Sequence, residues 1–194
     1  MTKSIDFYFD FISPYSYLAY QKIRSLKNHQ EIIINYKPIL LGGLHNLGGI
    51  TAPAFNERKL KNMKNDCELI AKKKEIQFIW NTKFPLNSLY LMRGYLVVDK
   101  KIKKDFFDLC FNAYWKDNID ISNQENLNNI LDNLKIDKKK FLEDIQAINI
   151  KDGLKKLTKI AFEKDIFGAP TFIVNKKIFW GQDRLEYALD EYYS

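Results

Sequence analysis

An aromatic, alternating segment that runs directly into a Ser-Pro pair constrains the fold of this chain more than any other feature. Residues 5–11 read Ile-Asp-Phe-Tyr-Phe-Asp-Phe, and Ile12 then leads to Ser13 and Pro14. A run of β-forming side chains of this kind predicts a buried strand, over residues 4–11. Serine is a favoured N-cap and proline a favoured first helical residue. The strand is therefore expected to deliver Ser13 to the N-terminus of a helix over residues 14–27.

Such a helix start is suited to binding an anion. The first N–H groups of a helix lack intrahelical partners, and its dipole is positive at this end. Ser13 and Ser16 have the spacing of a Cys-x-x-Cys redox pair but carry hydroxyl groups. Hydroxyls form no disulfide, yet they can donate hydrogen bonds to a thiolate that arrives on a ligand. For Ser16, support of that ligand and plain packing remain equally open.

The composition bounds the class of protein. A length of 194 residues suits one domain, or one domain with a large insertion, and 46% hydrophobic residues suffice for a packed core. Cys67 and Cys110 are far apart in predicted helices, which is typical of core cysteines in a reduced, cytoplasmic protein. His29 and His45 form no ligand cluster with them, so we expect no metal site. We also expect no signal peptide and no membrane span.

The net charge of +7 has a plain interpretation. The lysines are scattered among Asp, Glu and Asn, as in the runs at residues 100–104 and 138–140. No Gly-rich or aromatic RNA-binding signature accompanies these runs, so they are typical of a solvated surface and no nucleic-acid partner is expected. A small anionic ligand would still gain modestly from the positive field.

The periodicity divides the chain into two kinds of structure. After a second strand at residues 31–36 and a loop bounded by the glycine pairs 42–43 and 48–49, the period is helical from about residue 56 to 157. Ser122-x-x-Glu125 has the pattern of a capping box, and Asp137 that of an N-cap. The strand period returns at residues 171–175 and 178–180, with a tight turn at Asn175-Lys176, and a last helix follows.

The predicted order is therefore β-α-β, a helical block, then helix-β-β-α. This order indicates an α/β protein with a thioredoxin-like fold and a large all-helical insertion. We expect residues 1–55 and 153–194 to form the thioredoxin-like domain, and residues 56–152 to form an inserted helical domain that packs tightly against it.

Three segments together resemble a known family, although each alone is a weak signal. They are Asp-Phe-Ile-Ser-Pro-Tyr-Ser-Tyr-Leu-Ala at residues 10–19, Phe-Gly-Ala-Pro-Thr-Phe at 167–172 and Phe-Trp-Gly-Gln-Asp-Arg-Leu at 179–185. In this order and spacing the chain resembles the 2-hydroxychromene-2-carboxylate isomerases and the related kappa-class glutathione transferases. The resemblance covers nearly the whole chain and implies a DsbA-like fold with glutathione as cofactor.

The resemblance also implies roles for individual residues. Ser13, at the start of the helix with Pro14 and Ser16, matches the serine that holds the glutathione sulfur as a thiolate. Ala169-Pro170 matches a pair with a cis peptide bond, whose first residue offers its backbone to the cysteinyl part of glutathione. The turn that matches the grip on the γ-glutamyl end is formed by Gly181, Gln182, Asp183 and Arg184. Asp183 can alternatively cap the last helix, and Arg184 can pair with Glu186 or Glu191.

One departure from the family concerns the second substrate. Many relatives carry Gly-Asn in the loop before the helical insertion, where this chain has Gly48-Gly49. His45 is a substitute candidate for a substrate contact, against the simpler interpretation of a surface loop residue. Phe84 and Asn87 align with a segment that lines the family's substrate pocket.

The resulting hypothesis is a glutathione-dependent isomerase acting on an unsaturated aromatic 2-oxo or 2-hydroxy carboxylate, with Ser13 as the catalytic residue. The alternative is a kappa-class-like glutathione transferase or peroxidase, which consumes glutathione. A non-catalytic thioredoxin relative would form no thiolate at all. The sequence names neither the aromatic substrate nor the oligomeric state, and both a monomer and a homodimer remain open.

Overall fold

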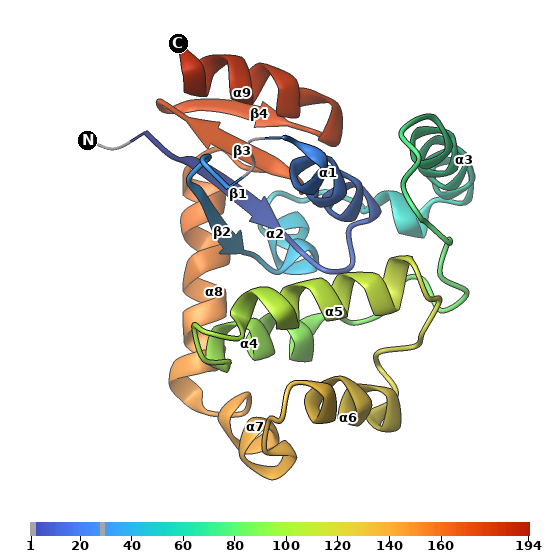
Figure 1. Cartoon of the computed structure of the whole chain (residues 1–194), viewed down its shortest axis with the longest axis vertical. Helices are drawn as coiled ribbons and strands as arrows, with labels where there is room; N and C mark the ends of the chain where they lie inside the picture. Colours follow the sequence, from blue (N-terminus) through green and yellow to red (C-terminus); the bar gives the residue numbers. More distant parts are fainter. Residues whose placement is uncertain (1–2, 28–29) are drawn as a thin grey trace.

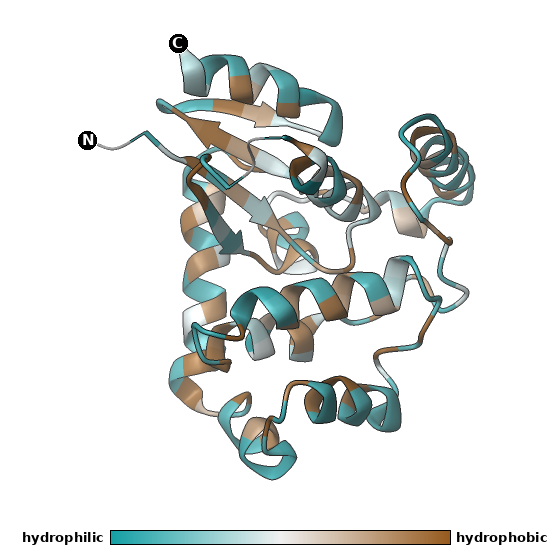
Figure 2. Ribbon diagram, in the orientation of Figure 1, coloured by the Kyte–Doolittle hydropathy of each residue, from teal (hydrophilic) through white to brown (hydrophobic). Residues whose placement is uncertain are grey.

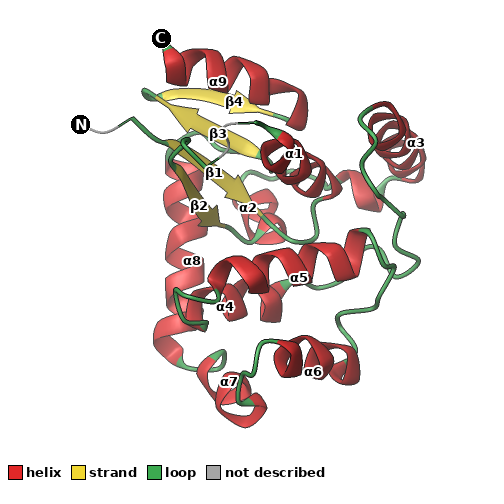
Figure 3. Cartoon of the chain, viewed as in Figure 1, coloured by secondary structure: helices red, strands yellow, loops and turns green. Residues whose placement is uncertain are grey.

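A four-stranded mixed sheet with helices on both faces organises one end of the molecule (Figures 1 and 3). The computed structural model describes residues 3–27 and 30–194, so His29 lies outside the described residues. The strand order is β2-β1-β3-β4, with β1 parallel to β2 and the other neighbours antiparallel. The strands are β1 (Ile5–Phe9), β2 (Ile34–Pro38), β3 (Thr171–Val174) and β4 (Lys177–Trp180).

The helices fall into two groups. Those around the sheet are α1 (Pro14–Ser25), α2 (Leu41–Leu47), α8 (Ile148–Glu163) and α9 (Leu185–Tyr193). Those between them in sequence are α3 (Glu57–Lys73), α4 (Leu89–Val97), α5 (Lys103–Trp115), α6 (Gln124–Asn133) and α7 (Lys138–Asp144), with short 3₁₀ turns η1 (Pro53–Phe55) and η2 (Gln182–Arg184). Figure 1 shows α4 to α7 below the sheet, α3 to one side, and α8 running along both parts. The predicted thioredoxin-like fold with a helical insertion is thus confirmed.

The aromatic run is explained by the position of β1 in the middle of the sheet. Phe7 and Phe9 point into a core that contains side chains of α1 and the inserted helices. Tyr8 points to the opposite face, into a smaller cluster with side chains of α2 and α8. A strand covered on both faces needs apolar side chains at successive positions rather than strict alternation. Figure 2 shows the hydrophobic colour on much of β1 and β3, whereas β2 is largely hydrophilic.

The two parts of the chain share one hydrophobic core. Residues of β1, α1 and all five inserted helices belong to a single cluster of buried side chains. The buried Trp115 at the end of α5 donates its indole N–H to the carbonyl oxygen of Phe11, over 2.8 Å. The predicted boundary at residues 152 and 153 falls within α8, which is one continuous helix. The insertion therefore packs directly behind the loop that carries Ser13.

Two local predictions are wrong for identifiable reasons. The segment with the glycine pairs is helix α2 rather than a loop, because its start is held from outside: the Leu40 and Leu41 N–H groups donate to Thr158 and Asp10. Helix α6 is capped by Asn123, one residue after the predicted Ser122, whose hydroxyl is hydrogen-bonded to Asp120.

Other local predictions are confirmed. The Asp137 side chain accepts the Lys140 N–H at the start of α7. Asn175 and Lys176 form the turn between β3 and β4 with positive φ angles of 48° and 68°. Both central φ angles are positive in the type I′ hairpin turn, whose twist matches that of the flanking strands. Strand β2, in contrast, begins three residues later than predicted, and its register places Ile34 opposite Ile5.

Candidate functional site

Ser13 is the N-cap of α1, as predicted. Its extended backbone (φ −83°, ψ 112°) ends the loop after β1, and Pro14 is the first helical residue. The Ser13 Oγ accepts the N–H of Ser16 over 3.1 Å and donates to the Ala169 carbonyl oxygen over 2.8 Å. The residue is only 3% exposed. The single hydroxyl proton of Ser13 is therefore already donated to the segment before β3. A ligand sulfur that accepted this proton would have to replace the Ala169 carbonyl oxygen as the acceptor.

Three distant segments meet beside Ser13. The Ala169-Pro170 peptide bond is cis. The Pro170 carbonyl oxygen accepts the N–H of Gly181 over 3.0 Å. Since β3 pairs with β4, Thr171 stands opposite Trp180, which brings the 181–184 turn to the same end of the sheet. Ser13, Ala169, Pro170 and Gly181 are thus brought together, as the motifs predicted.

The remaining residues of the turn point in different directions. The Gln182 side chain is buried, and its carbonyl oxygen accepts a hydrogen bond from the Lys22 ammonium, as does its backbone carbonyl. Asp183 and Arg184 are exposed and form an ion pair with each other, 2.9 Å between Nη1 and Oδ2. The expected partners of Arg184 on its own helix are therefore wrong, and Glu191 pairs with Lys177 instead.

Two predicted residues carry buried polar atoms without a hydrogen-bond partner among the described residues. The Ser16 hydroxyl is one, in the first turn of α1, where Ser16 is fully buried. The His45 Nδ1 is the other, and burial lowers the pKa of this imidazole. His45 belongs to helix α2 and is 9% exposed, so its interpretation as a surface loop residue is wrong.

Phe84 and Asn87 lie in the segment that leads into α4. The ring of Phe84 packs on Trp80 and Trp115, with centroids 4.9 and 5.7 Å away. Since the Trp115 indole donates a hydrogen bond to the Phe11 carbonyl oxygen, the cluster of Phe84, Trp80 and Trp115 supports the loop before Ser13. The Asn87 side chain is occupied locally, accepting the N–H of Leu89 over 3.0 Å.

A cavity of about 600 Å³ with a mixed lining, which includes the acidic residues Glu163 and Asp165, lies beside the segment that precedes Ala169. Its walls come from the end of α2, the following loop and the end of α8, and include Leu47, Ile50, Phe162 and Phe167. Phe167 also packs on Trp180, with ring centroids 4.7 Å apart. The cavity could therefore accommodate an aromatic or aliphatic group close to the Ser13 region.

Asp10 was missed as a site residue. Its carboxylate is fully buried and accepts the N–H of Ile12 over 3.1 Å and that of Leu41 over 2.8 Å. Its backbone carbonyl accepts the Ser13 N–H over 3.0 Å. Asp10 thus fixes the loop carrying Ser13 against the start of α2. In the sequence it is one of two aspartates within an apolar run, a pattern that does not distinguish a buried carboxylate from a loop residue.

Asp10 should make the free energy of unfolding depend on pH. Burial, partly offset by hydrogen bonds from Ser88, Leu41 and Ile12, raises its pKa from 3.8 to about 6. Its stabilising contribution is present below pH 3.8 and is lost as the pH rises through 6. Relative to the wild type, Asp10→Asn should therefore gain about 2 kcal/mol between pH 4 and pH 7. Urea unfolding of both proteins at both pH values measures this difference; equal pH dependences would show that Asp10 titrates normally.

No protein thiol is placed to react at this site. Cys67 and Cys110 are free and fully buried, on α3 and α5, and burial raises the pKa of both thiols. Within residues 3–27 and 30–194, no group of three or more His, Cys, Asp or Glu side chains is arranged to hold a metal ion. In the same part of the chain, every helix is too short or too polar to cross a membrane.

The comparisons with known proteins agree with this fold. The family model for the DsbA-like thioredoxin domain matches residues 4–193. A 2-hydroxychromene-2-carboxylate isomerase of Sphingobium xenophagum is 31% identical over 189 residues, 96% of each chain. Human glutathione S-transferase kappa 1 is 23% identical, over 96% of this chain and 89% of its own. A solved structure of 2-hydroxychromene-2-carboxylate isomerase superposes with a TM-score of 0.86 at 25% identity, over 96% of this chain and 92% of its own.

Proposed function

The chain belongs to the 2-hydroxychromene-2-carboxylate isomerase family of DsbA-like thioredoxin proteins, and from this premise we propose that it is a glutathione-dependent isomerase. Its substrate would be an unsaturated aromatic 2-oxo or 2-hydroxy carboxylate. The observation that carries the proposal is Ser13, which caps α1 beside the cis Ala169-Pro170 bond where a redox enzyme would need cysteine.

Glutathione is the thiol that we propose for this site. Glutathione appears in the name of the human relative, glutathione S-transferase kappa 1. Both cysteines of this chain are buried, so no exposed thiol of the protein could take its place. The tripeptide would lie along the segment around Ala169, with its γ-glutamyl end at Gly181 to Arg184. Because the Gln182 side chain is held by Lys22, we assign the contacts there to the turn's backbone and to Asp183 and Arg184. The two buried free thiols are in keeping with a reducing, cytoplasmic compartment.

The site would favour the thiolate form of glutathione. A free thiol has a pKa near ~8.5 and is mostly protonated at neutral pH. The positive end of α1 and a hydrogen bond from the Ser13 hydroxyl would together lower that pKa by roughly one to two units. To donate to sulfur, the hydroxyl must turn away from the Ala169 carbonyl, which then becomes free to accept the N–H of the ligand's cysteinyl residue.

The reaction would be covalent catalysis by a borrowed nucleophile. The thiolate forms a C–S bond to an alkene carbon conjugated with the substrate carbonyl, and the alkene π electrons move to that carbonyl as an enolate. The former double bond, now single, rotates. The enolate electrons then restore the double bond in the other geometry while the C–S bond breaks, which returns the thiolate unchanged. The side of the cavity lined by Ile50 and Phe167 would hold the aromatic ring.

The second candidate is a kappa-class-like glutathione transferase or peroxidase. The relationship to the human kappa enzyme supports it. The same thiolate site would serve, but the adduct or disulfide would leave as product. Consumption of glutathione distinguishes the two reactions.

An ultraviolet difference spectrum tests whether the site forms a thiolate. Glutathione added at pH 7 should produce thiolate absorbance, with a pH midpoint roughly one to two units below ~8.5. Ser13→Ala should move the midpoint back toward the free value. Calorimetry on the same samples establishes that glutathione is bound; bound glutathione without thiolate absorbance would refute the proposal.

A further inference from the structure

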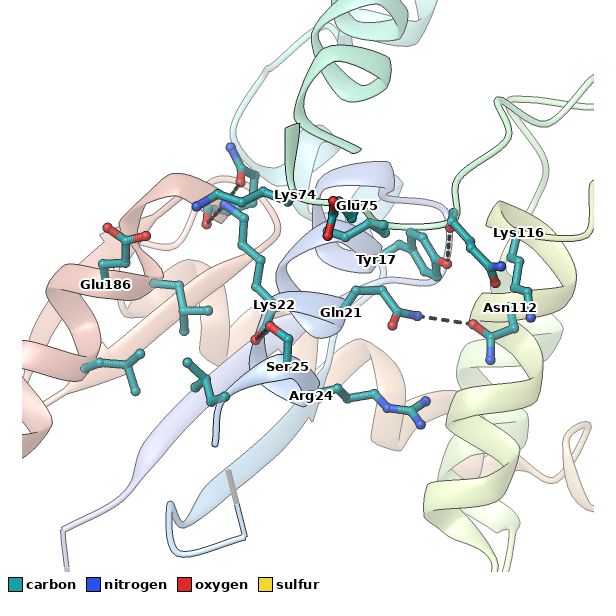
Figure 4. Close-up of a pocket in the computed structure, with 16 residues that line it drawn as sticks. Tyr17, Gln21, Lys22, Arg24, Ser25, Lys74, Glu75, Asn112, Lys116 and Glu186 are labelled. Carbon is teal, nitrogen blue, oxygen red and sulfur yellow. Dashed lines mark hydrogen bonds between the residues drawn. The ribbon is translucent and has the colours of Figure 1, made fainter. Parts of the chain in front are cut away.

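A polar groove of about 650 Å³ lies away from Ser13, along the second half of α1 (Figure 4). Its other walls are the segment 74–77 after α3, the end of α5, and the η2–α9 region. Ser13 caps the first turn of α1, whereas Lys22 is nine residues further on, about 13 Å along the helix axis. The groove volume lies within the usual range for small-molecule sites.

The charges in the groove are unbalanced. Four cationic side chains line it, those of Lys22, Arg24, Lys74 and Lys116, against two carboxylates, Glu75 and Glu186. Figure 4 shows Lys22 and Lys74 extending toward the Glu186 end, and Arg24 and Lys116 lying toward the opposite end. The groove therefore has cationic side chains at both of its ends, with Glu186 at the same end as Lys22 and Lys74.

At the Lys22–Lys74 end, burial and mutual repulsion disfavour the charged form of Lys22. Lys22 is partly buried, and both its burial and the nearby charge of Lys74 lower its pKa, against smaller opposing effects of Glu186 and Asp183. Its ammonium donates to both carbonyl oxygens of Gln182, which are neutral acceptors. An anionic group bound between the two ammonium groups would relieve their repulsion.

At the other end, positive charge exceeds negative charge. Arg24 is 3.3 Å from Asp108, which also binds Lys104, so this carboxylate is shared between two cations. No ion pair is found for Lys116 among the described residues. Between the ends, the Gln21 and Asn112 amides are hydrogen-bonded to each other over 3.2 Å and offer further polar contacts.

We propose that this groove binds a small molecule with two acidic groups, one at each end. Ammonium and guanidinium groups bind carboxylates and phosphates alike, so the shared chemistry is that of a dianion whose acidic groups are carboxylates or phosphates. The polar amides between the ends favour a hydrophilic body over an aromatic one. The groove adjoins the proposed glutathione site, with which it shares Gln182 as a wall, but its occupancy does not depend on the reaction proposed there.

Calorimetric titration with two probes tests the proposal: adipate, a dicarboxylate, and inorganic pyrophosphate, both at the same low ionic strength. The wild type should bind at least one of them saturably at one site, and the preferred probe identifies carboxylate or phosphate as the natural group. Acetate should bind at least tenfold more weakly. Lys74→Gln and Lys116→Gln should each weaken binding about tenfold, the loss of one charge-assisted contact.

Lys73→Gln is the matched control, because Lys73 is exposed on the last turn of α3 and does not line the groove. It removes the same charge and should change affinity less than twofold. Ser13→Ala, titrated without glutathione, should bind like the wild type, which separates this result from the fate of the proposed isomerase. Absence of saturable binding to both probes, or an equal loss in Lys73→Gln, would overturn the proposal.

Discussion

Ser13→Ala is expected to lower glutathione-dependent turnover by one to two orders of magnitude. The substitution removes the hydroxyl that accepts the Ser16 N–H at the start of α1 and donates to the Ala169 carbonyl oxygen. Loss of a hydrogen bond to a charged group costs about 1.5–3 kcal/mol, which is the basis of the expected factor. The N-cap is lost as well, at about 1 kcal/mol of stability, so turnover must be measured per folded protein.

Ser16→Ala is the matched control for this experiment. The Ser16 hydroxyl is buried without a hydrogen-bond partner among the described residues, so its removal breaks no bond that the structure contains. We expect turnover within about threefold of the wild type. Steady-state kinetics under saturating glutathione compare the two variants. If Ser13→Ala also stayed within about threefold, Ser13 would have no role in stabilising a thiolate.

Gly181→Ala is expected to weaken the use of glutathione and the fold together. Gly181 has φ 113° and ψ 153°, a conformation essentially restricted to glycine, and an added Cβ would lie 2.6 Å from Asp183 Oδ1. Its N–H also ties the turn to Pro170. We predict a loss of about 1–3 kcal/mol in the free energy of unfolding. The KM for glutathione should rise about tenfold with a smaller change in kcat, because the proposed γ-glutamyl contacts are displaced.

Gly153→Ala tests whether these effects are specific to the turn. Gly153 lies within α8, where an added Cβ would meet no atom within 4 Å. Alanine is the better helix former, so the variant should be about 0.5–1 kcal/mol more stable, with an unchanged KM. Urea unfolding and Michaelis kinetics on the two variants give both numbers. An unchanged KM in a destabilised Gly181→Ala protein would remove the turn from the glutathione site.

The parts of the fold that follow from local chemistry were predictable. Ser13-Pro14 carries its own N-cap and first-turn signals, and Asn175-Lys176 lies between two β-branched segments, so each forms the predicted element from its own residues. Helix α2 was not predictable in this way. Its start is stabilised by Thr158 and Asp10, and these two side chains reach it only in the folded protein.

The candidate site shows the same division. The motifs identified the segments that meet, since Ser13, Ala169 and Gly181 are close together as predicted. They did not reveal the buried carboxylate of Asp10, or that Gln182 is held by Lys22, because both depend on contacts between segments far apart in sequence. The motifs therefore predicted which backbone segments meet at the site, but not the contacts of individual side chains.

The central claim is that a glutathione thiolate formed at Ser13 adds to the substrate and is released again. Because the same helix end that stabilises the thiolate also makes it a better leaving group, the adduct should collapse to regenerate it. The direct test supplies an unsaturated aromatic pyruvate in large excess over glutathione and follows both isomerisation and free thiol by titration. We predict that many equivalents of substrate isomerise while the free thiol stays constant. Conversion that stops after one equivalent of glutathione, with matching loss of thiol, would contradict the claim and establish a transferase.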